Sequence, residues 1–463
     1  MKLNYFNFRE INGKMLLTND FGKYVFVEKQ DFKKLILKDV DMSSLIGRKL
    51  LETGMIYKGT DLRFSEVNEY GLRNIKSYLA TATSLHIFVV TTACNMNCTY
   101  CQANNGTLVP NCYMDEETAE KAVDIALQSP ERGLSFEFQG GEPLLNFEII
   151  QHIVEYAECH KGGHQIEYNV VSNLTLLTEQ MLDFFERYKF SISTSIDGDV
   201  NIHNNNRPLK NGGGSFDKTV KGINRIKNRG MCIGAIETTT RTTLDHFKQM
   251  IQSYLDLGFD SIFIRHLTQL GKANKSWDKI GYSAEEFLGF YKKTLDELIR
   301  INKNGLFIRE QHASIFLKKI KGKRMNYMEL RSPCGGGIGQ LAYFANGKIF
   351  TCDEGRMLAE MGNDAFQLGD VHRDTYQTLM KSGTCHAICA SSVLETIPSC
   401  CDCVYQPYCG TCPVVSYAIY DDVIEKYPNS FRCKVYAGIL DYLFGLLLEN
   451  DPDTIRVLDS WSE

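Results

Sequence analysis

Three closely spaced cysteines are the residues of this 463-residue chain best suited to chemistry. Cys94, Cys98 and Cys101 form a CxxxCxxC motif directly after an apolar stretch. Three thiolates at this spacing can hold three corners of a [4Fe–4S] cluster, whose usual protein ligands are four cysteines. The set of three predicts an open iron that takes an exchangeable ligand. The alternative is a zinc site, but such sites usually close with a nearby fourth Cys or His, and Cys112 is a poor fourth ligand for so tight a loop.

Short polar motifs follow three later apolar stretches. Gly140-Gly141-Glu142-Pro143 combines glycines, which let a backbone come close to a ligand, with a carboxylate suited to an ammonium group. Ser172-Asn173 and Ser195-Ile196-Asp197-Gly198 supply hydroxyl, amide and carboxylate groups. Arg207 could hold a carboxylate through two parallel hydrogen bonds. Ordinary strand-end turns and a surface salt bridge are the structural alternatives.

The cysteine motif, with Tyr100 directly before its third cysteine, resembles the radical S-adenosylmethionine (radical SAM) superfamily. The resemblance implies that SAM binds the open iron and is cleaved by an electron from the cluster to a 5′-deoxyadenosyl radical. It implies that residues 140–143 hold the SAM amino group, and that Ser195 or Asp197 contacts its ribose or carboxylate. It also implies that Arg207 holds the carboxylate and that Tyr100 packs beside SAM. Ser172 and Asn173 are further expected SAM contacts.

The cysteines beyond residue 333 resemble the SPASM extension, which binds two auxiliary [4Fe–4S] clusters. The resemblance implies two ligand sets: Cys334, Cys352 and Cys412 for the first cluster, and Cys400, Cys403, Cys409 and Cys433 for the second. The family pattern has three residues before the ligand that corresponds to Cys412, whereas this chain has two, and Pro413 occupies the expected position. A zinc ribbon over residues 400–412 is the alternative.

The remaining cysteines have plainer expected roles. Cys385 and Cys389, spaced four apart on an expected helix, are either spare ligands or buried small apolar side chains. Cys112, Cys159 and Cys232 are expected to be packing residues.

A narrower resemblance covers nearly the whole chain. Four segments, at residues 16–20, 193–198, 353–360 and 403–410, resemble the His-Xaa-Ser system radical SAM maturases, which modify ribosomally made precursor peptides. This implies two partners, a precursor peptide with a leader sequence and an external electron donor such as flavodoxin or ferredoxin. Asp353 could accept a proton during bond formation, although a salt-bridged turn that supports the cluster is the alternative.

Hydrophobic periodicity predicts the elements that position these motifs. Six strands are expected to alternate with amphipathic helices, at residues 85–91, 134–138, 165–171, 190–196, 232–237 and 261–266. Such alternation implies parallel pairing with right-handed crossovers. The expected fold is therefore α/β, a partial (β/α)6 barrel of the radical SAM kind. The Cys94–Cys101 loop and residues 140–143, 172–173 and 197–198 all lie just after expected strands.

The flanking regions predict further domains. Residues 1–80 hold two expected strands, 14–18 and 24–27, followed by a helix, and resemble a small winged-helix-like domain that grips leader peptides. A plain structural cap is the alternative. The radical SAM core is expected over 81–280, a helical bridge over 281–333 and the cysteine-rich SPASM domain over 334–463.

Composition limits the class of protein. A content of 43% hydrophobic and 23% charged residues is that of a globular protein, and a net charge of −5 predicts no nucleic-acid partner. The sequence contains neither an apolar run long enough to span a membrane nor the apolar core of a signal peptide. We therefore expect neither a membrane span nor export. Sixteen cysteines without an export signal indicate a cytoplasmic metalloprotein rather than one with disulfides.

Three functions remain in competition. The first is a peptide maturase that forms an intramolecular side-chain crosslink of cyclophane or thioether type. The second is an enzyme that oxidises a Cys or Ser of a protein to formylglycine, as sulfatase maturases do. The third is a non-catalytic iron–sulfur electron carrier, which would have no need for an exchangeable iron.

Overall fold

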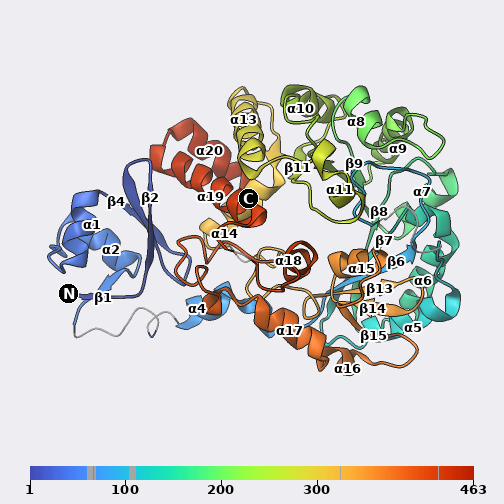
Figure 1. The fold of residues 1–463 in the computed structure, drawn as a ribbon, viewed down its shortest axis with the longest axis horizontal. Coiled ribbons are helices and arrows are strands. Elements are labelled where there is room, and N and C mark those ends of the chain that lie inside the picture. Colours follow the sequence, from blue (N-terminus) through green and yellow to red (C-terminus); the bar gives the residue numbers. More distant parts are fainter. Residues whose placement is uncertain (60–65, 67–68, 104–110, 324, 426) are drawn as a thin grey trace.

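The computed structural model describes residues 1–59, 66, 69–103, 111–323, 325–425 and 427–463. Within these residues, one sheet of ten strands forms the framework, in the order β12-β11-β10-β9-β8-β7-β6-β13-β14-β15 (Figure 1). Its middle section is a run of parallel strands that are neighbours in both sequence and space: β6 (Leu85–Thr91), β7 (Gly133–Gly140), β8 (Gln165–Val171), β9 (Ser191–Ser195), β10 (Ile233–Thr238) and β11 (Ser261–Arg265). The six predicted strands are therefore confirmed to within two residues at each end.

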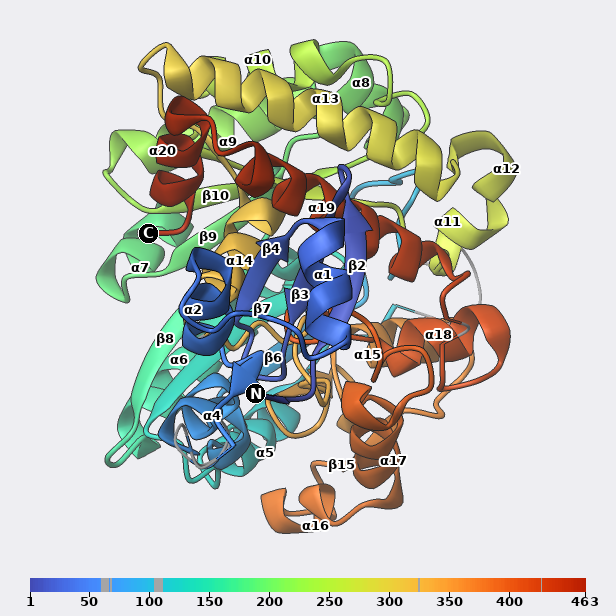
Figure 2. The ribbon, with the colours of Figure 1, turned by 90° about the vertical axis from the view of Figure 1, so that its left-hand side faces the viewer.

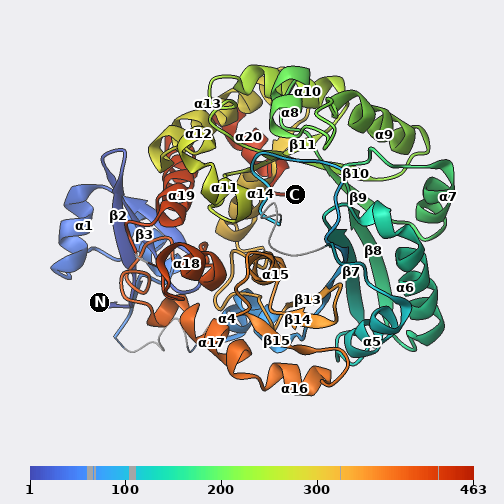
Figure 3. The ribbon, with the colours of Figure 1, turned by 45° about the vertical axis from the view of Figure 1, so that its right-hand side comes forward.

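Helices follow the strands as the alternating pattern predicts. They are α5 (Glu116–Ala126), α6 (Phe147–His160), α7 (Glu179–Arg187), α8 (Val200–Asn206), α9 (Phe216–Asn228) and α10 (Phe247–Asp256). Figure 3 shows α5, α6, α7 and α9 around the outside of the curved sheet. The α/β barrel fold is confirmed.

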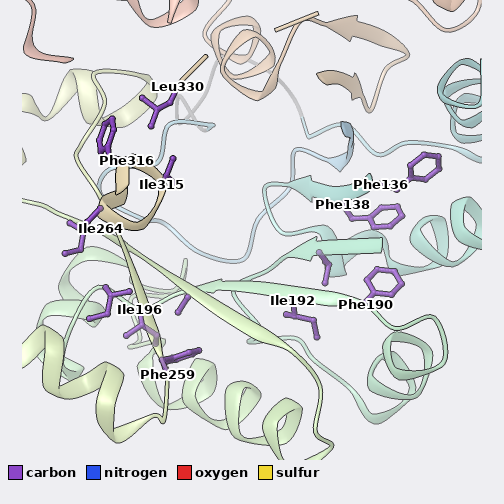
Figure 4. Packing of buried hydrophobic residues seen from close by; sticks show 14 of the residues in the cluster. Phe136, Phe138, Phe190, Ile192, Ile196, Phe259, Ile264, Ile315, Phe316 and Leu330 are labelled. Atoms are coloured by element: carbon purple, nitrogen blue, oxygen red, sulfur yellow. The ribbon is translucent and has the colours of Figure 1, made fainter. Parts of the chain in front are cut away.

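Alternation along the strands separates an apolar outer face from a polar inner face. In β7, Leu134, Phe136 and Phe138 are buried, whereas the residues between them are partly exposed. Phe136, Phe138 and Phe190 pack together against the helix layer (Figure 4). Because side chains alternate across a strand, the polar residues of β7 lie on the opposite, inner face.

The sheet extends beyond the six-stranded run at both edges. β12 (Arg309–Glu310) pairs parallel to β11, and β13 (Gln340–Phe344) pairs parallel to β6. β14 (Lys348–Phe350) and β15 (Gln367–Asp370) follow antiparallel to β13. The segment expected as a helical bridge thus contains α13 (Ala284–Lys303) and α14 (Gln311–Ile320) and also adds a strand, which covers an edge that would otherwise be unpaired.

The N-terminal region has a sheet and a core of its own. β2 (Asn7–Ile11), β3 (Lys14–Thr18) and β4 (Tyr24–Val27) form an antiparallel sheet, followed by α1 (Lys29–Ile36) and α2 (Leu45–Glu52). β3 and β4 are the two predicted strands, and β2 is an additional one. β1 (Lys2–Leu3) pairs with β5 (Ile56–Tyr57). Leu17, Val25, Leu35 and Leu50 are buried between the sheet and the helices.

The C-terminal region packs against both other parts. Its helices are α15 (Asp353–Glu360), α16 (Tyr376–Met380), α17 (Gly383–Ser391), α18 (Pro413–Tyr420), α19 (Phe431–Glu449) and α20 (Pro452–Trp461). α19 packs on α13 and on the N-terminal sheet (Figure 2). The remaining short helices are α4 (Glu69–Ile75), α11 (Gly271–Lys275) and α12 (Trp277–Ile280), with 3₁₀ turns at Ser77–Ala80, Pro143–Asn146 and Leu394–Thr396. Among the described residues, every helix is too short or too polar to cross a membrane.

Candidate cofactor and cluster sites

The loop that carries Cys94, Cys98 and Cys101 begins at the carboxyl end of β6 and is fixed through its backbone. Asn97 N donates to Pro208 O at 2.8 Å, and Thr99 N donates to Asn206 O at 2.8 Å. Lys272 N, at the start of α11, donates to Cys101 O at 2.9 Å. The three thiols are therefore held in place by the backbone of neighbouring segments.

The environment of these thiols suits metal-bound thiolates. Burial raises the pKa of Cys94 to about 12 and that of Cys101 to about 11. Burial keeps a free thiol protonated, whereas a coordinating thiol is deprotonated by the metal. The charges of Arg207 and Lys272 lower the pKa of Cys98 against the effect of burial, so two cations already favour the thiolate at this site.

Gly140 and Gly141 bring the end of β7 against the cysteine loop. A Cβ on Gly140 would lie 2.1 Å from Thr91 O, and one on Gly141 would lie 2.3 Å from Ala93 O. Gly141 N donates to Thr91 O at 2.9 Å, and Glu142 N donates to Ala93 O at 2.8 Å. The close approach that the glycines permit is thus to the chain that carries Cys94.

Glu142 joins the motifs that follow β7 and β8. Its buried carboxylate accepts from Ser172 Oγ at 2.7 Å, from Asn173 N at 2.8 Å and from Leu144 N at 3.1 Å. Asn173 Nδ2 in turn donates to Asn95 Oδ1, in the cysteine loop, at 2.9 Å. Burial raises the pKa of Glu142 despite these hydrogen bonds. The two motifs expected at SAM thus form one polar network beside Cys94.

Tyr100, Asp197 and Arg207 form a second buried network. Tyr100 Oη donates to Asp197 Oδ2 at 2.7 Å and accepts from Arg207 Nη1 at 2.6 Å. Burial raises the pKa of Asp197, and the charge of Arg207 opposes this rise. Within the Arg207 guanidinium, only Nη1 has a hydrogen-bond partner among the described residues, so Nη2 and Nε could bind a carboxylate. Asp197 holds Tyr100 and Arg207 in position, whereas Ser195 lies half-buried at the end of β9.

Four of the C-terminal cysteines line one cavity. Cys400, Cys403, Cys409 and Cys433 surround a volume of about 450 Å³. Burial raises the pKa of Cys409 to about 11 and that of Cys433 to about 12. A cavity of this size suits a body of four irons and four sulfides better than a single zinc ion. The donor set therefore fits the second auxiliary cluster.

Cys334, Cys352 and Cys412 meet in a separate buried group. They pack with Leu358 and Phe366 in one cluster of side chains. Cys352 Sγ accepts from Gly355 N at 3.4 Å, and Cys334 Sγ accepts from Gly336 N at 3.4 Å. Cys412 therefore lies beside the other two cysteines despite the one-residue shift, and Pro413 starts α18 directly after it.

Two charged side chains near these thiols were not assigned to them from the sequence. After burial, the charge of Glu354 is the main cause of the raised pKa of Cys352 and Cys412, and it acts on Cys334 as well. Arg432 directly precedes Cys433 and lines the same cavity. Glu354 is close to Cys352 in the sequence, but only the fold brings it near Cys334 and Cys412, which belong to distant segments.

Asp353 takes part in an ion-pair chain along α15. Arg356 Nε donates to Asp353 at 2.7 Å, Nη1 donates to Glu360 at 2.7 Å and Nη2 donates to Gln139 Oε1, on β7, at 3.2 Å. The charge of Glu360 also reaches Cys101, whose pKa it raises. α15 therefore extends from the Cys352 group toward the Cys94–Cys101 loop, and the salt-bridged turn at Asp353 is present.

The other cysteines differ in their surroundings. Cys112 packs against the core, but Cys159 and Cys232 are exposed, so the expectation that these two are packing residues is wrong. Cys159 lies on the outer face of α6, and Cys232 precedes β10 at the surface. Cys385 and Cys389 interact with each other across one turn of α17. Within the described ranges, no three His, Cys, Asp or Glu side chains converge closely enough to hold a single metal ion.

Comparison with known proteins places these features in a family. Residues 88–253 match the Radical SAM superfamily. An uncharacterized protein of Methanocaldococcus jannaschii is 30% identical over 242 residues, which cover 50% of this chain and 83% of the relative. The cysteine-type anaerobic sulfatase-maturating enzyme of Clostridium perfringens is 24% identical over 79% of this chain and 97% of its own length.

Two solved structures share the fold. One, described as native anSMEcpe with bound AdoMet, matches with a TM-score of 0.69 and 22% identity, over 82% of this chain and 99% of its own. The other, Streptococcus suis SuiB bound to the precursor peptide SuiA, matches with a TM-score of 0.55 and 15% identity, over 93% of this chain and 98% of its own.

Proposed function

This chain belongs to the radical SAM superfamily, and we propose that it modifies a ribosomally made precursor peptide by forming an intramolecular side-chain crosslink of cyclophane or thioether type. It is an enzyme of the sulfatase-maturase and peptide-modifying kind. In this superfamily a [4Fe–4S] cluster and SAM together supply the 5′-deoxyadenosyl radical, and the protein positions the target C–H bond.

The residues around the barrel mouth have roles that follow from their chemistry. Cys94, Cys98 and Cys101 hold the cluster. The network of Glu142, Ser172 and Asn173 offers anionic and amide oxygens to the SAM amino group. Arg207 offers Nη2 and Nε to the carboxylate, while Asp197 and Tyr100 fix its position.

Forming a crosslink between two side chains removes two hydrogen atoms. When bound, the cluster and SAM would supply a radical that removes one hydrogen atom, which leaves one electron and one proton to be removed. Auxiliary clusters held by the two C-terminal cysteine groups would have potentials set by burial and hydrogen bonding and could accept the electron. Asp353, which lies beside Cys352 and pairs with Arg356, would accept the proton, and an external flavodoxin or ferredoxin would supply the reducing electron.

One observation carries this proposal. α15 lies between the Cys94–Cys101 loop and the Cys334–Cys352–Cys412 group, so a peptide side chain bound beside this helix would be near both. The N-terminal sheet and helices would bind the leader sequence, which accords with a solved relative that holds a precursor peptide. The substrate would belong to the His-Xaa-Ser type of system.

A formylglycine-forming activity is the second candidate. Its supporting observation is the sulfatase-maturating relative, which aligns over 97% of its length. That reaction also removes two hydrogens, but from one residue. It requires no leader-binding domain, so the N-terminal region of this chain favours the crosslinking function.

The first experiment is anaerobic reconstitution of the wild type and of a Cys94/Cys98/Cys101→Ala variant, followed by iron and sulfide counting. We expect about twelve irons in the wild type and about eight in the variant. With SAM and dithionite, only the wild type should release 5′-deoxyadenosine. Zinc in place of iron, or no deoxyadenosine from fully loaded protein, would contradict the proposal.

The second experiment separates the two candidate reactions. The enzyme would be incubated with the product of a small open reading frame beside its gene, or with a cysteine-containing sulfatase peptide. A crosslink removes two hydrogens from two residues, and fragmentation in a mass spectrometer then yields no ions between them. An aldehyde that reacts with a hydrazide, formed on the sulfatase peptide alone, would establish the second function instead.

A further inference from the structure

Asn95, Asn173 and Thr175 form a closed ring of side-chain hydrogen bonds between the cysteine loop and the end of β8. Thr175 Oγ1 donates to Asn173 Oδ1 at 2.6 Å, and Asn173 Nδ2 donates to Asn95 Oδ1 at 2.9 Å. Asn95 Nδ2 donates back to Thr175 Oγ1 at 2.7 Å, which closes the ring. Asn95 directly follows Cys94, so the ring lies one residue from a proposed cluster ligand.

One backbone group fixes the direction of every bond in this ring. Thr175 N donates to Asn173 Oδ1 at 3.0 Å, so that atom is the amide oxygen. The Asn173 nitrogen then donates to Asn95, whose facing atom is therefore its oxygen. The remaining Asn95 nitrogen donates to the Thr175 hydroxyl, and the proton of this hydroxyl points to Asn173. Because each member both donates and accepts, the bonds of the ring polarise and strengthen one another.

The backbone between Asn173 and Thr175 is held in a conformation that side chains rarely adopt. Leu174 has a φ of 63° and is 2% exposed. Its N–H donates to Ser172 Oγ at 2.9 Å, and α9 packs so close that a Cβ on Gly222 would lie 2.7 Å from Leu174 Cβ. Such a conformation persists only where the surrounding structure enforces it. The turn that brings Thr175 back to Asn173 is therefore fixed by its surroundings.

The ring is also connected to the carboxylate that is proposed for the SAM amino group. Asn173 N donates to Glu142 Oε2 at 2.8 Å, and Glu142 N donates to Ala93 O at 2.8 Å. The chain around Cys94 is thus bonded to this network twice, through Ala93 before the cysteine and through Asn95 after it. Opening the ring would loosen the second connection and leave the first in place.

We propose that Asn95 and Thr175 are positioning residues, which hold Cys94 in register with the SAM amino group through the ring. The inference rests on the proposed function, because it requires a cluster at Cys94 and SAM at Glu142. Since the ring consists of protein groups alone, it orders the loop before a cluster binds. A loosened loop can still hold a cluster through three thiolates, but it no longer keeps the open iron and Glu142 at a fixed separation. SAM should then bind less tightly.

Thr175→Val is the test variant, because valine has the shape of threonine and lacks the hydroxyl that two bonds of the ring share. Thr175→Ser keeps the hydroxyl and should behave as the wild type. The chain offers a matched control in Thr219, which is 1% exposed and whose Oγ1 donates to the main-chain oxygen of Asn173 at 3.1 Å. Thr219→Val therefore removes a hydrogen bond to the same residue but leaves the ring closed.

The first measurement is amide hydrogen exchange before reconstitution, which requires no cluster. Exchange over residues 92–101 should be about two- to tenfold faster in Thr175→Val, the range expected for loss of one ordinary hydrogen bond. It should be unchanged in Thr175→Ser. Asn95→Leu opens the same ring from its other side, so adding Thr175→Val to it should have little further effect. Additive effects of these two substitutions, or an equal increase in Thr219→Val, would overturn the proposal.

The second measurement is 5′-deoxyadenosine formation by the reconstituted protein at varied SAM concentration. With equal iron contents, Thr175→Val should raise the KM for SAM about two- to tenfold with a smaller change in kcat, and Thr175→Ser should restore both. An unchanged KM, or a fall in kcat alone, would contradict the proposal.

The iron content separates the remaining outcomes. Loss of about four irons in Thr175→Val, restored in Thr175→Ser and absent from Thr219→Val, would support the proposal, whereas equal loss in both valine variants would overturn it. If the fully loaded wild type forms no deoxyadenosine, the proposed function itself fails, and the inference fails with it even where hydrogen exchange shows the ring.

Discussion

Gly141 lies at the barrel mouth, at a position with no room for a side chain. Its α-carbon faces the carbonyl of Ala93, one residue before Cys94, and both groups belong to hydrogen-bonded backbone. Neither can move without moving a strand end or the cysteine loop. The glycine is therefore needed to place Cys94, a proposed cluster ligand, rather than to make a turn flexible.

We expect Gly141→Ala to displace the Cys94 loop. An alanine Cβ would lie 2.3 Å from Ala93 O, which no contact of this kind tolerates. After reconstitution, the variant should contain about four irons fewer than the wild type. Gly133→Ala is the control, because a Cβ at that position of the same strand meets nothing within 4 Å. Full iron content in Gly141→Ala would show that the loop can adjust.

Cys389 offers a test of the spare-ligand question. A hydrogen bond from the Cys385 thiol stabilises its thiolate and lowers its pKa below the ordinary value. Because the thiolate is the reactive form, alkylation by iodoacetamide should begin at lower pH than for an ordinary thiol. Cys385→Ala removes the hydrogen bond and should move the midpoint of the rate profile to higher pH.

The measurement is the alkylation rate against pH, followed by mass spectrometry of the residue 383–391 peptide. Comparing apo and reconstituted protein adds a control. Protection of Cys389 only in the reconstituted protein would show that it is a cluster ligand and contradict the expectation that it is a free, reactive thiol.

At the scale of elements, α15 is the connection between two sites. It starts with Cys352 as its N-cap and ends at Glu360. It packs against β13, β14 and α18 (Figure 3). Arg356, 1% exposed, holds this helix to β7 through Gln139. Side chains alternate along β7 and turn Gln139 toward the barrel interior. Its hydrogen bond with Arg356 therefore also determines where α15 packs.

Arg356→Met should destabilise the protein by about 3–5 kcal/mol, the usual cost of leaving a buried charge without its partner. Burial raises the pKa of Glu360 to about 7, and Arg356 opposes that rise. Because the pKa of Glu360 is higher in the folded protein than in the unfolded chain, its contribution to stability is fully present below the unfolded-state pKa. That contribution is lost as pH rises through about 7. Without Arg356 the pKa of Glu360 rises further, so Arg356→Met should destabilise the protein more at pH 8 than at pH 6.

Thermal unfolding of the two proteins at pH 6 and pH 8 checks this expectation. Arg373→Met is the control, since its pair with Asp370 is 3.8 Å long and Arg373 is 73% exposed. A destabilisation independent of pH would mean that Glu360 is not the group responsible.

At the scale of the whole molecule, the N-terminal sheet is attached to the second auxiliary region. Thr18 Oγ1 donates to Val404 O at 2.7 Å, and Asn7 Nδ2 donates to Cys403 O at 3.1 Å. The Tyr24 ring lies 5.2 Å from that of Phe444 on α19. A domain expected to bind a leader sequence thus contacts the segment that carries Cys403, a proposed cluster ligand.

Phe444→Ala should loosen this attachment. The side chain is fully buried between α19, the N-terminal sheet and Tyr405, and its removal should cost about 3–5 kcal/mol. Amide hydrogen exchange over residues 14–27 should become faster, while exchange in β6–β9 stays unchanged. Phe307→Ala, at a side chain 43% exposed, is the control. Equal changes across the whole chain would indicate global destabilisation instead.

The amino-acid sequence was sufficient for the barrel strands, the hairpin at residues 14–27 and the motifs at the ends of β6 to β9. These depend on period-two and helical patterns within about ten residues, and on short spacings such as CxxxCxxC. The parallel order of β6 to β11 also followed, because helical crossovers leave few other arrangements.

Only the tertiary structure decided what depends on contacts between distant segments. It brought Cys412 to Cys334 and Cys352 despite the shortened spacing, extended the sheet with β12 and β13, and showed Cys159 and Cys232 at the surface. It also placed Arg432 at the wall of the four-cysteine cavity and α15 between two sites. Packing sets such contacts through shape and burial over the whole chain, and no local pattern of residue types records them.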